Sequence, residues 1–213
     1  KITLKNIPAI ITDVQNFKDN HLLISIFSIQ YGKKKLVVFG GKSKKKNSNY
    51  VKGMLNEIEF NDDNNCLNSN SIKTFNWFLY DKYRLKTIDY SCYLISKLLF
   101  LQDESSRVIE YYSSLISRMN KNQNYLSELM LLELEILKTS GYQPDFNESV
   151  LSKIFRNHKI MNFKSNEQII KNLDNNLELQ FLFFDFLGRV ISRVLINLHI
   201  HLPFPRNDTI KRN

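Results

Sequence analysis

The sequence predicts an α+β protein in which a small five-stranded β-barrel precedes an α-helical bundle. Short β-rich runs separated by turn residues fill the first 80 residues, and from Asp81 onwards apolar residues recur at the i, i+3, i+4 spacing of helices. We therefore expect two domains, at residues 1–80 and 81–213. The hydrophobic content of 43% is high enough to bury a core.

The first domain contains five runs that predict strands. These are Ile7–Phe17, His21–Gln30, Leu36–Phe39, Leu55–Phe60 and Ile72–Leu79. Gly32 favours a hairpin turn between the second and third runs, because glycine adopts a positive φ without steric cost. The stretch 61–70 is rich in Asn, Asp and Ser and is expected to be a loop. Five short strands at this spacing suit a small barrel.

The second domain contains four apolar patterns of helical period. They predict helices through Tyr90–Leu101, Val108–Met119, Tyr125–Ser140 and Asn176–Ile200. Gly141 is the expected C-cap of the third helix, and Pro203 follows the end of the last. The pattern is weak over 147–174.

The charge distribution is uneven along the chain. The net charge is +9, and the first 60 residues contain 11 Lys and only 4 acidic residues. Such asymmetry suggests a polyanionic partner for the first domain. The alternative is a bias towards Lys, Asn and Ile across the whole sequence, which raises the Lys count without any function.

The sharpest local feature is Tyr31–Lys46, which contains seven lysines at the two ends of the expected strand Leu36–Phe39. That strand is only ~13 Å long, so we expect the lysines to share a small surface. Ammonium groups this close repel each other unless an anion compensates them, and a phosphodiester backbone is such an anion. The expected phosphate-binding residues are Lys33, Lys34, Lys35, Lys42, Ser43, Lys44, Lys45 and Lys46. The alternative is a solvated loop that only maintains solubility.

Three aromatic residues lie near these lysines. Tyr31, Phe39 and Tyr50 could stack on nucleic-acid bases, as aromatic rings do in single-strand-binding proteins. Phe39 closes an apolar run, so we expect it to point into the barrel. For Tyr31 and Tyr50 both roles stay open.

An ordered set of weak motifs resembles the bacterial recombination mediator family RecO. In the first domain these are Ala9–Ile11, Phe17–Asn20, Leu23–Ser28, Tyr31–Lys33 and Phe39–Lys44, and in the second they are Leu129–Phe146 and Leu202–Arg206. The resemblance implies that the barrel is an oligonucleotide-binding (OB) fold. It also implies a further basic contact at Arg206.

The resemblance implies a DNA-binding protein without enzymatic activity. Members bind single- and double-stranded DNA, anneal complementary strands, and act with RecR to help RecA displace single-strand-binding protein. They also contact the acidic, apolar C-terminal tail of that protein through the helical domain. A cytoplasmic, nucleoid-associated location is expected.

The last predicted helix has a broad apolar stripe, which we interpret first as core. A second interpretation is a groove for an amphipathic peptide, with Phe181, Phe184, Arg189 and Arg193 as partner-binding residues. The alternative function is then a protein-interaction adaptor whose helical domain docks an acidic, apolar tail and whose Lys-rich loop is only solvating. Charged residues interrupt the stripe, so we expect no membrane span.

The sequence departs from the family pattern at several positions. Many members carry four zinc-binding cysteines after the third helix, but 147–174 contain no Cys, so we expect no metal. Leu129, Met130 and Leu131 stand where members often have Arg, which weakens any partner contact through those residues. The sequence contains no phosphate-binding loop, nucleophile elbow or metalloprotease motif, so we expect no catalytic residues and no cofactor.

Overall fold

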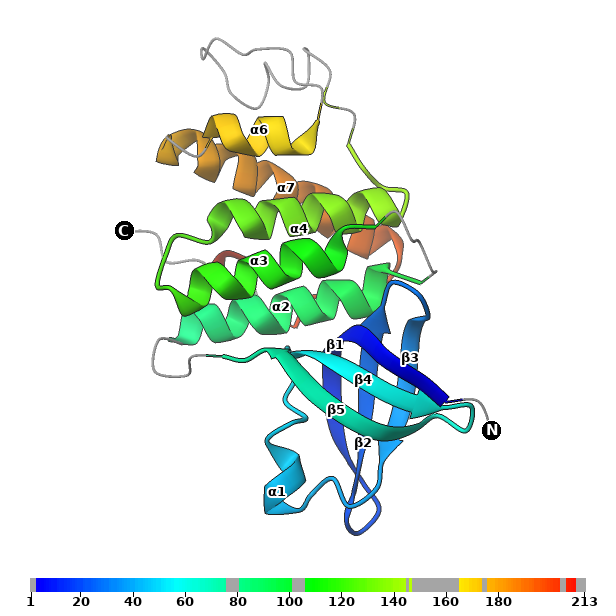
Figure 1. Ribbon diagram of the computed structural model, residues 1–213. Helices are drawn as coiled ribbons and strands as arrows, with labels where there is room; N and C mark the ends of the chain where they lie inside the picture. The colour runs from blue at the N-terminus through cyan, green and yellow to red at the C-terminus, as the bar shows by residue number, and fades with distance from the viewer. Residues whose placement is uncertain are drawn as a thin grey trace.

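A closed β-barrel forms one end of the molecule and a stack of helices forms the other (Figure 1). The structure is a computed structural model that describes residues 3–75, 81–100, 106–144, 146, 165–173, 176–203 and 206–209 of the 213-residue chain.

The barrel has five strands in the order β1-β2-β3-β5-β4, and β4 closes it by pairing with β1. The strands are β1 (Thr3–Phe17), β2 (His21–Ser28), β3 (Gly32–Val38), β4 (Leu55–Asn61) and β5 (Asn65–Lys73). All neighbours are antiparallel except β3 and β5, which pair in parallel over two residues. A short helix, α1 (Lys44–Asn47), connects β3 to β4. This topology confirms the OB fold.

Alternating burial explains the strand faces. In β2, Leu22, Ile24 and Ile26 point into the barrel, while Leu23 and Ser25 lie on its outer face. In β3 the buried positions are Leu36 and Val38. The period-2 pattern of the sequence therefore sets which side chains reach solvent.

Two strands differ from the prediction. β3 begins at Gly32 rather than Leu36, because its register with β2 continues through Lys33–Lys35 to the hairpin turn. β5 occupies much of the expected loop 61–70, because most of its side chains face solvent and only Cys66 and Ser69 are buried. Residues 76–79 of the expected strand lie outside the described residues.

The predicted helices are confirmed with shifted ends. They are α2 (Lys82–Leu98), α3 (Val108–Asn120), α4 (Leu126–Thr139) and α7 (Leu177–Asn197), and they are joined by α6 (Asn166–Leu173) and a 3-10 turn, η2 (Arg206–Thr209). Asp81 begins α2 by accepting hydrogen bonds from the backbone N–H groups of Tyr83 and Arg84. Gly141, at φ +80°, follows the end of α4 as expected.

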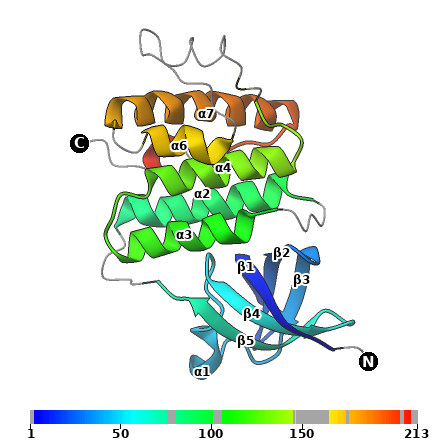
Figure 2. The same ribbon diagram turned by 45° about the horizontal axis from the view of Figure 1, so that its top comes forward.

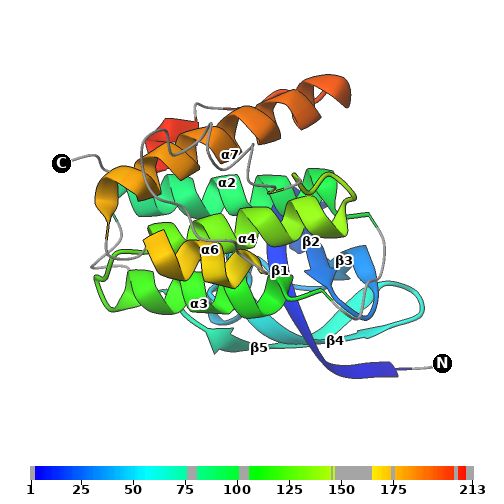
Figure 3. The same cartoon turned by 90° about the horizontal axis from the view of Figure 1, so that it is seen from above.

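Helix α4 is the centre of the helical part (Figures 1 and 3). It contacts α2, α3, α6 and α7, and it is buried on nearly every side, including Glu133 at 0% exposure. A buried carboxylate needs a partner, and Glu133 obtains one from η2, as described below. Among the described residues, no helix combines the length and apolar character needed to cross a membrane.

Helices α2 and α3 cover one end of the barrel (Figure 2). The hydroxyl of Tyr112 on α3 donates to the carbonyl of Gly53, at 2.6 Å, and the Cys92 thiol on α2 donates to the carbonyl of Ile11, at 3.8 Å. Lys52 and Asp89 add an ion pair at 2.7 Å. The barrel and helices therefore share one continuous core, with α1 at the opposite end of the barrel (Figure 1).

Replacing Gly53 with alanine is expected to destabilise this junction by about 2–4 kcal/mol, the sum of overpacking and left-handed backbone strain. Gly53 has φ +89°, and a Cβ atom there would lie 2.2 Å from Cγ2 of Ile88. Gly40→Ala is the matched control, because Gly40 has φ +65° but nothing within 4 Å of its Cβ position. Urea unfolding should show a small loss, about 1 kcal/mol, for the control. Equal losses of stability in both variants would contradict the close packing of Gly53 against Ile88.

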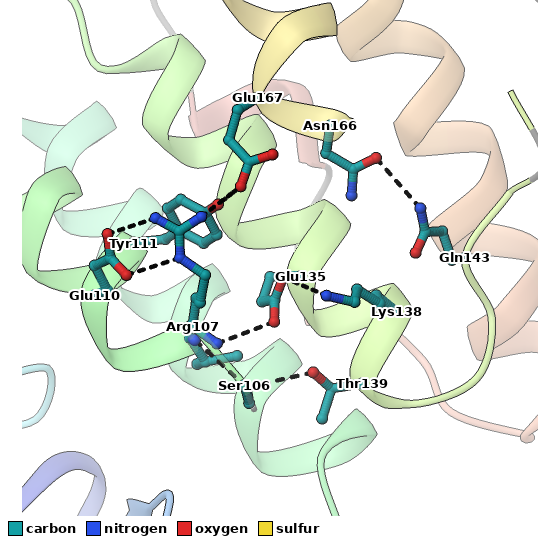
Figure 4. A network of polar contacts seen from close by, with 11 residues as sticks. Ser106, Arg107, Glu110, Tyr111, Glu135, Lys138, Thr139, Gln143, Asn166 and Glu167 are labelled. Atoms are coloured by element: carbon teal, nitrogen blue, oxygen red, sulfur yellow. Dashed lines mark hydrogen bonds and ion pairs between the residues drawn. The ribbon is translucent and has the colours of Figure 1, made fainter. Parts of the chain in front are cut away.

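A polar network attaches α6 to α3 and α4 (Figure 4). The Arg107 guanidinium bonds both oxygens of Glu110, at 2.8 and 2.6 Å, and also reaches Glu167 on α6 at 2.5 Å. Tyr111 donates to the same Glu167 oxygen. Ile170 and Leu173 bury the apolar side of α6. The position of α6 thus depends on exposed ion pairs as well as on burial.

Acid is expected to loosen α6 before it affects the barrel. The hydrogen bond from Arg107 holds the pKa of Glu110 below its ordinary value, and that from Tyr111 does the same for Glu167. Because the folded-state pKa values are lowered, their contribution is present above the unfolded value near 4.5 and is lost as pH falls through the folded values. Hydrogen exchange at pH 3 against pH 7 should show α6 amides losing protection first. Uniform loss across α6 and the barrel would contradict this.

Candidate nucleic-acid interface

The outer face of β1, β2 and β3 is built from rows of cross-strand neighbours. Strand register aligns Asp13 with Ser25 and Ser25 with Lys35 in one row. The next row towards the α1 end of the barrel aligns Gln15, Leu23 and Val37 in the same way. The side chains of both rows are half-buried or exposed, and the row of Asp13, Ser25 and Lys35 is entirely polar.

The row nearest the α1 end consists of three rings. Phe17 pairs with His21 across the hairpin, and the rings of His21 and Phe39 meet edge to face with centroids 4.9 Å apart. Phe39 is 53% exposed, and Phe17 and His21 are half-buried. We call Phe17, His21 and Phe39 the aromatic row. Exposed rings of this kind offer π-faces on which bases stack.

His21 also contributes a polar group to the aromatic row. Its Nδ1 accepts a hydrogen bond from the backbone N–H of Gly40, at 3.1 Å. This bond favours the tautomer with its proton on Nε2, which leaves an N–H donor for a ligand.

A group of lysines surrounds the aromatic row. We call Lys18, Lys42, Lys44, Lys45 and Lys46 the distal basic end. The Lys42 ammonium donates to the carbonyls of Lys18 and Asp19, at 2.8 and 3.0 Å, which joins the 39–43 loop to the β1–β2 turn. Lys46 donates to the carbonyl of Phe39, and the Lys18 ammonium lies 5.4 Å from the centroid of the Phe17 ring.

These lysines retain capacity for an anion. Each ammonium has three N–H donors, and the bonds above use two of those of Lys42 and one of those of Lys46. Within the described part of the chain, none of the five forms an ion pair with a carboxylate. Ser43 is exposed, and its hydroxyl makes no cap bond to α1. The arrangement can hold phosphates beside the aromatic row.

The other predicted lysines lie elsewhere. Lys33, Lys34 and Lys35 belong to β3, where Lys33 and Lys35 are exposed on the outer face and Lys34 is half-buried opposite Ile26. Lys33 donates to the carbonyl of Ser96 on α2 at 2.7 Å. Lys33, Lys34 and Lys35 lie within β3 rather than before it, so the two lysine groups do not share the small surface expected at the ends of a four-residue strand.

The aromatic predictions are also resolved. Phe39 is exposed rather than inside the barrel, because β3 ends at Val38 and Phe39 takes the outward position that follows. Tyr50 is buried against Cys66, and Tyr31 is half-buried with its ring edge to face on Phe60. Neither tyrosine belongs to the aromatic row.

The structure contradicts the basic contact with DNA that was expected at Arg206. Its side chain is 6% exposed, and it forms an ion pair with Glu133 at 2.5 Å. The same guanidinium donates to the hydroxyl of Tyr90 and the carbonyl of Phe184. Burial opposes the charge, but Glu133 and Tyr90 outweigh it and hold the pKa of Arg206 above its ordinary value. Arg206 is thus a buried structural residue whose guanidinium is engaged by Glu133, Tyr90 and Phe184.

The partner-binding residues on α7 separate into two kinds. Phe184 is fully buried beneath the Arg206 guanidinium, 3.3 Å from its ring centroid, so its prediction as a partner contact is wrong. Phe181 is half-buried, and Arg189 and Arg193 are exposed. These three stay candidates.

The expectation that the chain binds no metal concerns mainly residues that the structure does not describe. Residues 147–164, in which no zinc site is expected because they contain no Cys, lie outside the described residues. In the described ranges, no three His, Cys, Asp or Glu side chains gather as metal ligands would. Cys66 and Cys92 are both buried free thiols.

Sequence reasoning missed Phe17, Lys18 and His21. The signal was present, because Phe17 and His21 flank the Lys18–Asn20 turn symmetrically, and such flanking residues pair across a hairpin on one face. The interface thus joins a hairpin turn to the loop after β3.

Comparison with known families agrees with this architecture. The model for Recombination protein O N terminal matches residues 3–74, and the model for Recombination protein O C terminal matches residues 80–166. The chain belongs to the Recombination protein O family. The first family region spans the OB barrel and the second contains α2, α3 and α4, and membership supports a role in recombinational DNA repair. No curated protein matches the chain.

Proposed function

We propose that this Recombination protein O family member binds single- and double-stranded DNA through the distal basic end and the aromatic row, and that it anneals complementary strands. The observation that carries the proposal is the juxtaposition of Phe39, 53% exposed, with lysines free of carboxylate partners in the described chain. Phosphate contacts supply affinity for any strand, and exposed rings add affinity for unpaired bases.

The geometry suits strand annealing. A strand held by its phosphates and by stacking keeps the hydrogen-bonding edges of its bases available for a complementary strand. Partial neutralisation by lysines also lowers the repulsion between two phosphate backbones. No covalent step is required, so we propose a mediator rather than an enzyme.

The family context suggests the wider role. We propose that the protein acts in the cytoplasm at the nucleoid, and that with RecR it assists RecA in replacing single-strand-binding protein. Family membership supports this proposal, since the family is one of recombination mediators.

The test is direct. Fluorescence anisotropy with a labelled 20-nucleotide single strand and its duplex should show binding to both, and mixing complementary strands should give faster annealing with the protein than without it. Binding to single strands should fall with salt at a slope of roughly −3 to −4 on a log–log plot, as expected for four or five phosphate contacts. Absence of binding at low salt would refute the proposal.

A second proposed contact is the acidic, apolar tail of single-strand-binding protein on α7. Leu177, 60% exposed, and Phe181 line a hollow of about 370 Å³ together with Arg84. A second hollow further along α7 is lined by Arg189 and Arg193. A tail whose apolar end lies in the first hollow and whose acidic residues lie near the arginines of the second would match this pattern.

A fluorescent nine-residue acidic peptide with an apolar C-terminus tests this contact. Phe181→Ala and Arg193→Ala should each weaken binding. Ile196→Ala is the matched control, since Ile196 is 66% exposed on the same helix and lines neither hollow. Equal affinity of all four proteins would refute the contact and leave the DNA-binding proposal intact.

A further inference from the structure

Two exposed phenylalanines mark the two ends of the outer face of β3. Phe39 directly follows the strand and is 53% exposed, and Phe100 is 64% exposed beside Lys33, the second residue of the strand. Phe39 belongs to the aromatic row, whereas Phe100 follows α2 on the helical part. Both rings offer exposed π-faces on which the bases of one strand can stack.

Phe100 is held in place despite its exposure. The Lys33 ammonium lies 4.0 Å from the centroid of its ring, within the range of a cation–π contact. The same ammonium is fixed by its bond to the carbonyl of Ser96, at 2.7 Å. A base stacking on the open part of this ring would therefore meet a pre-positioned surface, which lowers the entropy lost on binding.

Positive charge gathers beside this ring. Partial burial, and secondarily the nearby Lys97 ammonium, lower the pKa of Lys33. A phosphate would relieve the repulsion between the two ammonium groups. Of the acidic groups in the neighbouring hollow, Asp89 forms an ion pair with Lys52 at 2.7 Å, and Asp13 accepts a hydrogen bond from the Gln15 amide at 2.6 Å.

The face between the two rings matches an extended strand. Lys33 on β3 and Phe39, directly after it, are six residues apart, which corresponds to ~20 Å of extended chain. Lys35 is exposed between them and Val37 is half-buried. This length suits roughly four nucleotides, the low end of the site sizes of OB folds.

We infer that Phe100 is a second base-stacking residue, so that single-stranded nucleic acid runs from the aromatic row along β3 and onto the end of α2. Lys33 and Lys97 contact a phosphate beside the stacked base. This inference rests on the proposed function and adds a contact from the helical part. It implies that barrel and helices bind one strand jointly.

Anisotropy with fluorescein-labelled dT20 tests the inference. Phe100→Ala should weaken binding about 5- to 150-fold, as for loss of one stacked base, and Phe100→Trp should stay close to wild type. Tyr142→Ala is the matched control, because Tyr142 is 41% exposed after α4 and is not on the β3 face. Photocrosslinking with 5-iododeoxyuridine oligonucleotides should label peptides containing Phe39 and Phe100.

The outcomes separate the inference from the proposed function. Wild-type affinity of Phe100→Ala, alongside loss in Phe39→Ala, would overturn the inference only. An equal loss in Phe100→Trp would also overturn it, since stacking would not explain the effect. If Phe100→Ala weakens the binding of a polyglutamate peptide as much as the binding of dT20, the surface is a general polyanion site and the inference fails. Lack of any wild-type DNA binding would remove the proposed function itself.

Discussion

Replacing Arg206 with alanine is expected to lower the free energy of unfolding by about 3–5 kcal/mol, the usual cost of leaving a buried charge without its partner. The substitution leaves Glu133, which is 0% exposed at the centre of α4, without its cation. It also removes a hydrogen-bond donor from the hydroxyl of Tyr90 and the carbonyl of Phe184. Urea unfolding followed by circular dichroism would measure the loss, with no change expected in the slope.

The double variant Arg206→Met, Glu133→Leu is the control for this prediction. It removes both charges, so it should recover most of the lost stability, because apolar replacements of buried ion pairs are often neutral or stabilising. The double variant should also bind DNA like wild type, since Arg206 is buried. An unchanged unfolding midpoint for Arg206→Ala would contradict the buried pair and return Arg206 to the candidate DNA contacts.

Replacing Lys42, Lys44, Lys45 and Lys46 together with alanine is expected to weaken single-strand binding on the order of 100- to 1,000-fold at 0.1 M salt. Each lost phosphate contact also flattens the salt dependence by about 0.7, so the log–log slope should shift towards zero by about 3. Annealing should slow in parallel. The melting temperature should fall only slightly, because Lys44, Lys45 and Lys46 are exposed and contribute little to folding, whereas Lys42 is half-buried and bonds two carbonyls of the β1–β2 turn.

A charge-matched variant distinguishes a local site from net charge. Lys82, Lys121, Lys138 and Lys171 are exposed on the helical part, and their replacement with alanine removes the same four charges. This variant should keep most of the affinity and nearly all of the salt slope. Equal losses in the two variants would show that the lysine excess acts only through net charge, as compositional bias would predict.

The fold was largely predictable because its periodicities are local. The alternation in β2 and the apolar stripes of α3 and α4 determine their faces without reference to distant residues. Prediction failed where composition opposed structure. β5 is mostly polar because its outer side faces solvent, and α1 consists of three lysines and an asparagine, so neither carries an apolar signature.

The site was only partly predictable because its key relations are long-range. The lysines are visible in the sequence, but their separation depends on where β3 begins. Phe39 was expected to point into the barrel but lies one position after the inward-facing Val38. Because side chains alternate along a strand, this single position directs its ring outwards. Arg206 and Glu133 are 73 residues apart, and no local pattern reveals that they pair.

The place of η2 in chain order has a consequence for biosynthesis. All five strands of the barrel lie between residues 3 and 73, ahead of the helices, so the barrel can pair its strands on the ribosome before the helical part is complete. Glu133, in contrast, emerges long before Arg206, and until then the helical part contains a carboxylate without its cation. We expect the nascent chain to fold in two stages, with the helices settling only after η2 is released from the exit tunnel.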